Sequence, residues 1–263
     1  MLNSVVDILG LNRVSRAVLG EAASAMAGMV KFRASAGSGN DRPLVAATMF
    51  GVTTPCVERA KAVLEAAGYE VLVFHATGNG GQALEALVRE GMFAGVLDVT
   101  TTELADELVG GMLSAGPTRL SAAAETGTPQ VVSVGALDMV NFHGIDSVPE
   151  KFRGRKLHRH NANVTLMRTN ATENAALGSE IGHKLAKARG PVSILLPLRG
   201  VSAIDREGEP FDDPLARRLL FDSIRAHCVG VECLEYDLHI NDAAFAEKLA
   251  ERLLAMMKLA PRR

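Results

Sequence analysis

The chain has 263 residues, of which 48% are hydrophobic and 22% charged, so it is long enough for one large domain or two small ones with an apolar core. Its net charge of -2, its aromatic content of 4% and its lack of tryptophan argue against a binder of nucleic acids. No apolar stretch approaches the roughly 20 residues that cross a bilayer, so no membrane association is expected. The three cysteines show no metal-type pairing, which favours a reducing, cytoplasmic location.

The first element expected in the chain is a helix. Apolar and small residues recur at steps of three and four between residues 12 and 30, in NRVSRAVLGEAASAMAGMV. The stretch SAGSGND then interrupts the pattern, as a linker does. We therefore expect an N-terminal helical segment with its linker over residues 1–40 and a main domain over residues 41–263.

From residue 42 onward, short apolar runs alternate with helical patterns. Helices are expected between these runs and after the last of them, with Gly68, Gly91 and Gly190 as stops. This order is typical of an α/β fold with a doubly wound, mostly parallel sheet (Rossmann-like) and helices on both faces. The runs expected as strands are PLVAATM, YEVLVF, FAGVLDV, PQVVSVGAL, VSILLPL and VECLEYDL.

One long stretch departs from this alternation. Residues 141–170 show no clear period and carry several cations, so we expect a long irregular excursion there. Such loops are uncommon in compact domains and are often functional. A surface excursion that merely closes the core is the alternative.

Three consecutive strand ends carry loops suited to binding an anion at the crevice of an open sheet. Thr54, followed by Pro55, is expected to cap the helix after the first strand. Asn79, with Gln82 three residues later, is expected to cap the second helix, and Thr100 with Glu103 the third. Each loop would present backbone N–H groups at a helix N-terminus, which attract phosphate.

The glycine-rich stretch HATGNGGQ, at the second strand end, strengthens this interpretation. Gly78, Gly80 and Gly81 would let the backbone come close to a ligand. The alternative is that glycines and caps only turn the chain from strand to helix. The sequence contains neither a G-x-G-x-x-G motif after a strand nor a G-x-x-x-x-G-K-[ST] motif, and GSEIGHK lies within a helical pattern.

A metal site or a catalytic nucleophile has little support. His158 and His160 alternate on an extended segment but lack an acidic or cysteine partner at ligand spacing, so no metal is predicted. The cysteines lie on apolar faces, and no G-x-S-x-G motif occurs. His75, Asp98 and Glu103 are the candidates for proton transfer if the crevice is catalytic.

Several long motifs resemble one family. The chain is similar to the second half of an uncharacterised two-domain family that includes the ATP-binding N-terminal region of the tomato mosaic virus resistance protein. The resemblance implies a Rossmann-like second domain with nucleotide in the cleft where two such domains meet. The motifs that carry it are SVVDILGLNRVSRAVLGEAASAMAGMV, MFGVTTPCV, FHATGNGGQALE, DVTTTELADEL, GALDMVNFHG, HNANVTLMRT and LLPLRGVSAID.

Matched residue by residue, the resemblance favours the same strand-end loops as the ligand site. Asp138, Asn141, Arg168 and Arg199 also lie in matching motifs, without an assigned role. The binding residues it implies are Phe50, Gly51, Thr53, Thr54, Gly78, Asn79, Gly80, Gly81, Thr100, Thr101 and Glu103.

The first domain of that family carries an Asp-Thr-Lys motif, which this sequence lacks. We therefore expect the chain to begin where the second domain begins. Either a separate subunit supplies the first domain, or a homo-oligomer covers the exposed face, with the helix over residues 12–29 as its candidate surface.

The function expected is binding of ATP or another phosphate-bearing ligand, completed by a partner domain or a second subunit. The alternative is an enzyme that acts on a small carboxylate or phosphorylated metabolite in the same crevice.

Overall fold

A computed structural model of the protein describes residues 10–32 and 42–259. The chain divides into two units, Met1–Asp41 and Arg42–Arg263. The linker expected over residues 35–41 lies outside the described residues.

The first unit contains the expected helix, α1 (Arg13–Lys31). Asn12 caps it, because its side chain accepts hydrogen bonds from the amides of Val14 and Ser15, both at 2.9 Å, and Ser15 accepts one from the Asn12 amide in return. No side chain of this described helix is buried. Leu19 and Met26 are 56% and 58% exposed, so α1 has an apolar surface that residues 10–32 leave uncovered.

The second unit is built on a six-stranded sheet in the order β2-β1-β3-β4-β8-β9, in which every neighbouring pair is parallel. All six strands match runs that the sequence predicts. They are β1 (Leu44–Met49), β2 (Glu70–His75), β3 (Gly95–Thr100), β4 (Gln130–Gly135), β8 (Val192–Pro197) and β9 (Glu232–Tyr236).

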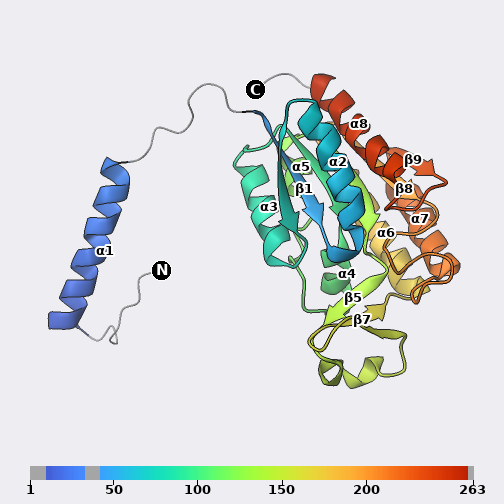
Figure 1. The fold of residues 1–263 in the computed structure, drawn as a ribbon, viewed down its shortest axis with the longest axis horizontal. Coiled ribbons are helices and arrows are strands. Elements are labelled where there is room, and N and C mark those ends of the chain that lie inside the picture. The colour runs from blue at the N-terminus through green and yellow to red at the C-terminus, as the bar shows by residue number, and fades with distance from the viewer. Residues whose placement is uncertain (1–9, 33–41, 260–263) are drawn as a thin grey trace. The chain divides into compact units, whose positions relative to one another are not determined.

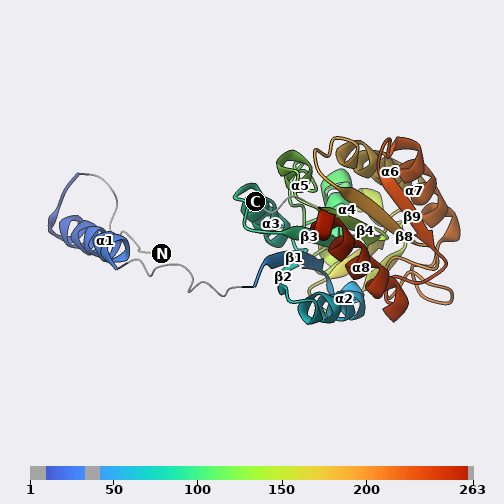
Figure 2. The same cartoon turned by 90° about the horizontal axis from the view of Figure 1, so that it is seen from above.

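Helices cover both faces of this sheet (Figures 1 and 2). Seen from above, α2 and α8 lie on one side, and α4, α5, α6 and α7 on the other (Figure 2). The expected doubly wound α/β fold is therefore confirmed. The helices are η1 (Gly51–Thr53), α2 (Thr54–Ala66), α3 (Asn79–Arg89), α4 (Thr102–Val109), α5 (Ala122–Thr126), α6 (Ala171–Leu185), α7 (Pro214–His227) and α8 (Ala243–Leu259).

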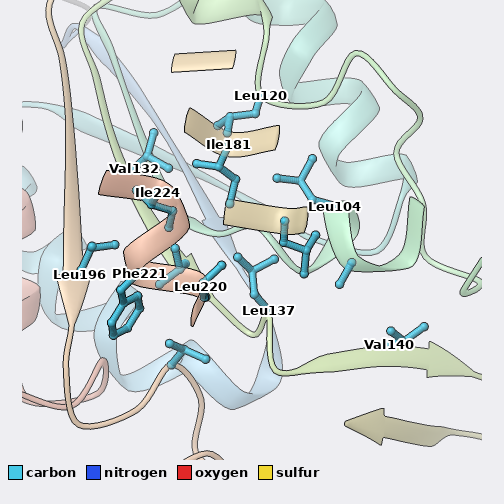
Figure 3. Close-up of a cluster of buried hydrophobic side chains, with 14 of the residues drawn as sticks. Leu104, Leu120, Val132, Leu137, Val140, Ile181, Leu196, Leu220, Phe221 and Ile224 are labelled. Carbon is cyan, nitrogen blue, oxygen red and sulfur yellow. The ribbon is translucent and has the colours of Figure 1, made fainter. Parts of the chain in front are cut away.

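Alternation along the buried strands builds a core on each face. Val45 and Ala47 of β1 pack with α2 and α8, whereas Ala46 between them packs with α3 and α5. The largest cluster lies under α4, α6 and α7, where Val132, Ile181 and Ile224 are fully buried (Figure 3). Strands that are apolar on both faces require this double cover.

The irregular excursion expected over residues 141–170 is wrong in part, because the structure forms a second sheet there. Three antiparallel strands in the order β5-β7-β6 lie beyond the carboxyl ends of the main strands (Figure 1). Each has only three or four residues, too few to show a period in the sequence. The elements are β5 (Met139–Phe142), η2 (Ile145–Ser147), η3 (Glu150–Phe152), β6 (Leu157–Arg159) and β7 (Thr165–Arg168).

The packing of α8 gives a test of the core. Phe245 is fully buried and meets Tyr236 edge to face at 6.0 Å. Phe245→Ala should lower the free energy of unfolding by about 3–5 kcal/mol, since a cavity replaces the ring. Leu259→Ala, at an 84% exposed position of the same helix, is the control and should change it by less than about 0.5 kcal/mol. Denaturant unfolding measures both, and equal effects would contradict the placement of α8.

Candidate functional site

The candidate site lies at the carboxyl ends of β1 and β3, where the strand order reverses. The chain passes from β1 outward to β2 and then returns across β1 to form β3 on its other side. Ligands bind at such points in open sheets, because the loops diverge there and leave a crevice. The helices η1 and α4 begin directly after these two strands.

The side chain of Thr53 holds the loop after β1 in place. Its hydroxyl accepts a hydrogen bond from the Phe50 amide (3.1 Å) and bonds to the hydroxyl of Thr100 (2.8 Å). This joins the loop to the end of β3. Thr54, expected as the helix cap, is instead the first residue of α2, after Thr53, and no side chain caps this helix.

The glycine-rich stretch does not present free amides, contrary to the prediction. The amides of Gly78 and Gly81 both donate to one carboxylate oxygen of Glu103, at 2.7 and 3.0 Å. The expected capping boxes are therefore not formed: Glu103 reaches across to α3 rather than back to Thr100, and α3 starts at Asn79 without a side-chain cap of its own. The protein's own carboxylate occupies the anion position.

Close approach within the protein also explains why these positions are glycines. A Cβ at Gly80 would lie 1.9 Å from the carbonyl oxygen of His75, and one at Gly81 would lie 2.3 Å from the Glu103 carboxylate. Gly78 has a φ of +85°, and its Cβ would lie 2.8 Å from the carbonyl oxygen of Ser114. Internal packing, rather than a ligand, thus accounts for each glycine.

Glu103 belongs to a buried ionic cluster around Arg119. The guanidinium of Arg119, fully buried, donates to both oxygens of Asp98 (2.6 and 2.7 Å) and to Glu103 (2.6 Å). Glu85 lies 3.5 Å away. Burial raises the pKa of Glu103, and the opposing effect of Arg119 only partly offsets it.

Backbone amides compensate the remaining negative charge of the cluster. Glu85 accepts hydrogen bonds from the amides of Leu120 (2.6 Å), Ser121 (3.2 Å) and Ala122 (2.7 Å), at the start of α5. Leu120 has a φ of +70°, a strained conformation for a residue with a side chain. The strained turn aims Arg119 and these amides at the same group of carboxylates.

No pattern in the sequence points to Arg119 or Glu85 as residues of the site. Arg119 stands in GPTRLSAAAE, a stretch without a clear period. A lone arginine in such a segment is usually exposed. The two residues come together only because the chain between α4 and α5 folds back over the end of β3.

Burial affects the three candidates for proton transfer differently. Asp98 and Glu103 have an exposed fraction of 0% and are held by Arg119, so neither reaches a substrate at the surface. His75 is exposed, and its ring lies 5.5 Å from that of Phe50. Asp98 and Glu103 are thus revised to structural residues, and proton transfer at this edge would fall to His75.

The binding residues predicted from the sequence also separate by exposure. Those that are buried bond to the protein itself: the Thr101 hydroxyl, for example, donates to the Ser133 carbonyl. The buried ones are Thr53, Gly78, Gly81, Thr100, Thr101 and Glu103, and the exposed or half-buried ones are Phe50, Gly51, Thr54, Asn79 and Gly80.

A second buried polar cluster lies beyond the ends of β4 and β8. Ser202 donates to one oxygen of Asp138 (2.8 Å), while the other oxygen is buried without a hydrogen bond. Arg168 and Arg217 both donate to Asp205 (3.2 and 2.9 Å). The pKa of Asp138 is raised to about 7, mainly by burial and secondly by repulsion from the Asp205 carboxylate. The positive charge of Arg168 opposes this rise.

The other two residues of the matching motifs lie apart from the site. Asn141 donates its side-chain amide to Asp106 (2.7 Å) and so joins β5 to α4. Arg199 is exposed and pairs with Asp237 at 2.6 Å.

Among the described residues, no group of three or more His, Cys, Asp or Glu side chains is arranged for a metal ion. No helix within residues 10–32 and 42–259 has the length and apolar character to cross a membrane.

Fold and site together define a doubly wound α/β domain whose strand order reverses at β1 and β3. The profile of the Uncharacterised protein family (UPF0261) C-terminal domain matches residues 42–257, and the chain belongs to this family. The profile of the family's N-terminal domain matches residues 1–35. This corrects the expectation that the chain begins with the second domain, since α1 falls within the N-terminal match.

Two curated relatives illustrate the similarity. A UPF0261 protein of Clostridium tetani (strain Massachusetts / E88) is 52% identical over 260 residues, which are 98% of this chain and 64% of the relative. The ToMV resistance protein Tm-1(GCR237) of Solanum lycopersicum is 48% identical over 95% of this chain and 34% of its own length. The chain therefore spans less than two thirds of either relative.

A distant likeness is found among solved structures. The esterase domain of a Rhodothermus marinus protein is similar over 84% of this chain and 87% of its own, with a TM-score of 0.42 and 14% identity.

Removal of Arg119 tests the ionic cluster. Arg119→Met should lower the free energy of unfolding by about 3–5 kcal/mol, because buried carboxylates lose their counter-charge. Arg199→Met, which breaks an exposed ion pair, is the control and should have little effect. Denaturant unfolding at neutral pH compares them. If Arg119→Met were as mild as the control, the carboxylates would not depend on the guanidinium.

The raised pKa of Asp138 predicts how stability changes with pH. The folded protein holds this proton up to about pH 7, whereas an aspartate of the unfolded chain releases it near 3.8. The associated stability is complete below pH 3.8 and is lost as the pH rises to about 7. Asp138→Asn should therefore lose less stability than the wild type between pH 4.5 and pH 8, as measured by urea unfolding over roughly this window. Asp146→Asn, at an exposed position, is the control and should show the wild-type dependence of stability on pH. The same dependence in Asp138→Asn would contradict the prediction.

Proposed function

We propose that this chain is a domain that binds ATP or another phosphate-bearing ligand at the carboxyl ends of β1 and β3. The observation that carries the proposal is the reversal of strand order there, with helices that start directly after both strands. The family resemblance independently implies a nucleotide. An enzyme acting in the same crevice remains the alternative, with His75 as its proton-transfer group.

Within this crevice, the loop after β1 is the place for the phosphate. Glu103 already fills the position at Gly78 and Gly81, so a second anion there would meet a carboxylate. Gly51, in contrast, is exposed, and a Cβ built on it meets no atom within 4 Å. Its amide lies in the first turn of η1, where a helix leaves N–H groups without an intrahelical partner. The N-terminus of α2 follows immediately and adds a favourable dipole.

The assembled protein would contain the remainder of the N-terminal domain. Residues 1–35 match that domain, and several apolar side chains of α1 are exposed in the described residues. The relatives are longer than this chain, so a polypeptide of that domain, as a separate subunit or a linked segment, is the partner that fits α1. A homo-oligomer that pairs two copies of α1 is the other assembly.

Three free cysteines, two of them buried, suit the reducing cytoplasm.

Binding of MgATP tests the proposal, and Gly51 offers a specific variant. Gly51→Asp adds a negative charge at an open position where φ is not positive, so the fold should be preserved. We expect it to abolish MgATP binding by calorimetry, in this chain or in its complex with the first-domain polypeptide. Gly154→Asp is the matched control, because Gly154 is also exposed and open, and it should bind as the wild type does.

Two outcomes would overturn the proposal. One is the absence of MgATP and inorganic phosphate binding both with and without the first-domain polypeptide. The other is binding that Gly51→Asp and Gly154→Asp reduce equally. Light scattering of the chain alone and of the mixture decides between a homo-oligomer and a complex with that polypeptide.

A further inference from the structure

Helices α6 and α7 pack unusually close to each other, at a distance from the candidate site (Figures 1 and 2). A Cβ at Gly178 would lie 2.5 Å from the carbonyl oxygen of Leu220, and one at Gly182 would lie 2.6 Å from the Cβ of His227. The motif GSEIG, which matches no nucleotide fingerprint, therefore has a packing role. Glycines four residues apart give one helix a flat surface on which the other rests.

This packing brings two histidines side by side. His183 follows Gly182 in the last turn of α6, and His227 is the last residue of α7. Their ring centres are 4.7 Å apart, with an angle of 44° between the planes. Two imidazoles that bind one zinc ion through nitrogens at about 2.0–2.1 Å would have ring centres about 5 Å apart. The observed spacing of the rings is close to this value.

Backbone hydrogen bonds determine which nitrogen of each imidazole ring carries the proton. The Nδ1 atom of His183 lies 2.7 Å from the Ser179 carbonyl oxygen, and the Nδ1 atom of His227 lies 2.7 Å from that of Ser223. A carbonyl oxygen only accepts, so each Nδ1 carries the proton. In the neutral ring Nε2 then has a free lone pair, and neither Nε2 has a hydrogen-bond partner among the described residues. This is the arrangement in which metal-binding histidines are usually held.

The charges around the pair also suit a cation. Both histidines stand at helix C-termini, where the dipoles place negative potential. Two cations close to the pair in the chain have partners, since Lys184 pairs with Glu180 at 2.7 Å and Arg225 pairs with both Asp222 and Glu235.

We infer that His183 and His227 form a binding site for a zinc-class divalent transition-metal ion. The protein supplies two imidazole nitrogens, and water completes the coordination, because the described residues place no third side-chain ligand there. Such an ion would clamp the ends of α6 and α7. His183 is exposed, so the ion has access from solvent.

Titration of the chelator-treated protein with Zn²⁺ by calorimetry tests the site. We expect one ion per chain, and an affinity reduced about 10–100-fold in His183→Gln and in His227→Gln. His160→Gln, at an exposed position away from the pair, should bind as the wild type does. His183 is exposed and its replacement leaves the helix packing intact, so its variant is informative even if His227→Gln folds poorly.

Histidine NMR gives an independent measurement on the metal-free protein. Long-range ¹⁵N–¹H spectra at neutral pH should show the proton of both rings on Nδ1, and Zn²⁺ should shift both Nε2 resonances. Protons on Nε2 in the absence of metal, or equal zinc affinity in the wild type and both histidine variants, would overturn the inference.

Discussion

The end of the sheet at which the site lies depends on one buried guanidinium. Arg119 meets Asp98 on β3 and Glu103 on α4, and Glu103 in turn holds the amides that begin α3. Thus one side chain, carried by an irregular and strained segment, connects a strand and two helices. The cost of burying ions makes such a cluster a weak source of stability, but breaking it leaves charges without partners. Its effect is to define a single arrangement of these elements.

Internal carboxylates also occupy helix termini at this end of the sheet. Three loops leave the sheet with similar composition, and each begins a helix whose dipole attracts an anion. Glu103 satisfies the α3 terminus, which is one of these three, and Glu85 satisfies the start of α5, which follows none of these loops. No such carboxylate bonds to the loop at Gly51 among the described residues. Whether the protein fills such a terminus itself therefore depends on side chains that lie far away in the sequence.

The sequence predicted the main sheet because its strands are long and apolar and its helices have recognisable stops. Gly68, for example, follows the end of α2 as expected, with a φ of +92°. The small sheet was missed because its strands are too short to show a period. Within the site, the sequence correctly indicates that the glycines allow a close approach, but it does not show to what. A ligand and the Glu103 side chain would both require glycine at these positions. Only the fold distinguishes the two.

The glycines of the helix pair that carries the histidines can be interpreted in the same two ways. Gly178 and Gly182 do not form a phosphate loop, because they lie within a helix, but their small size lets another helix come close. By letting α7 rest directly on α6, they bring His183 and His227 together from two separate helices. Each histidine alone, at the end of a helix, would only complement the dipole. Two such ends side by side concentrate negative potential, and each imidazole, with its Nδ1 proton bound to a backbone oxygen, keeps the lone pair of its Nε2 atom. A divalent ion would satisfy both conditions.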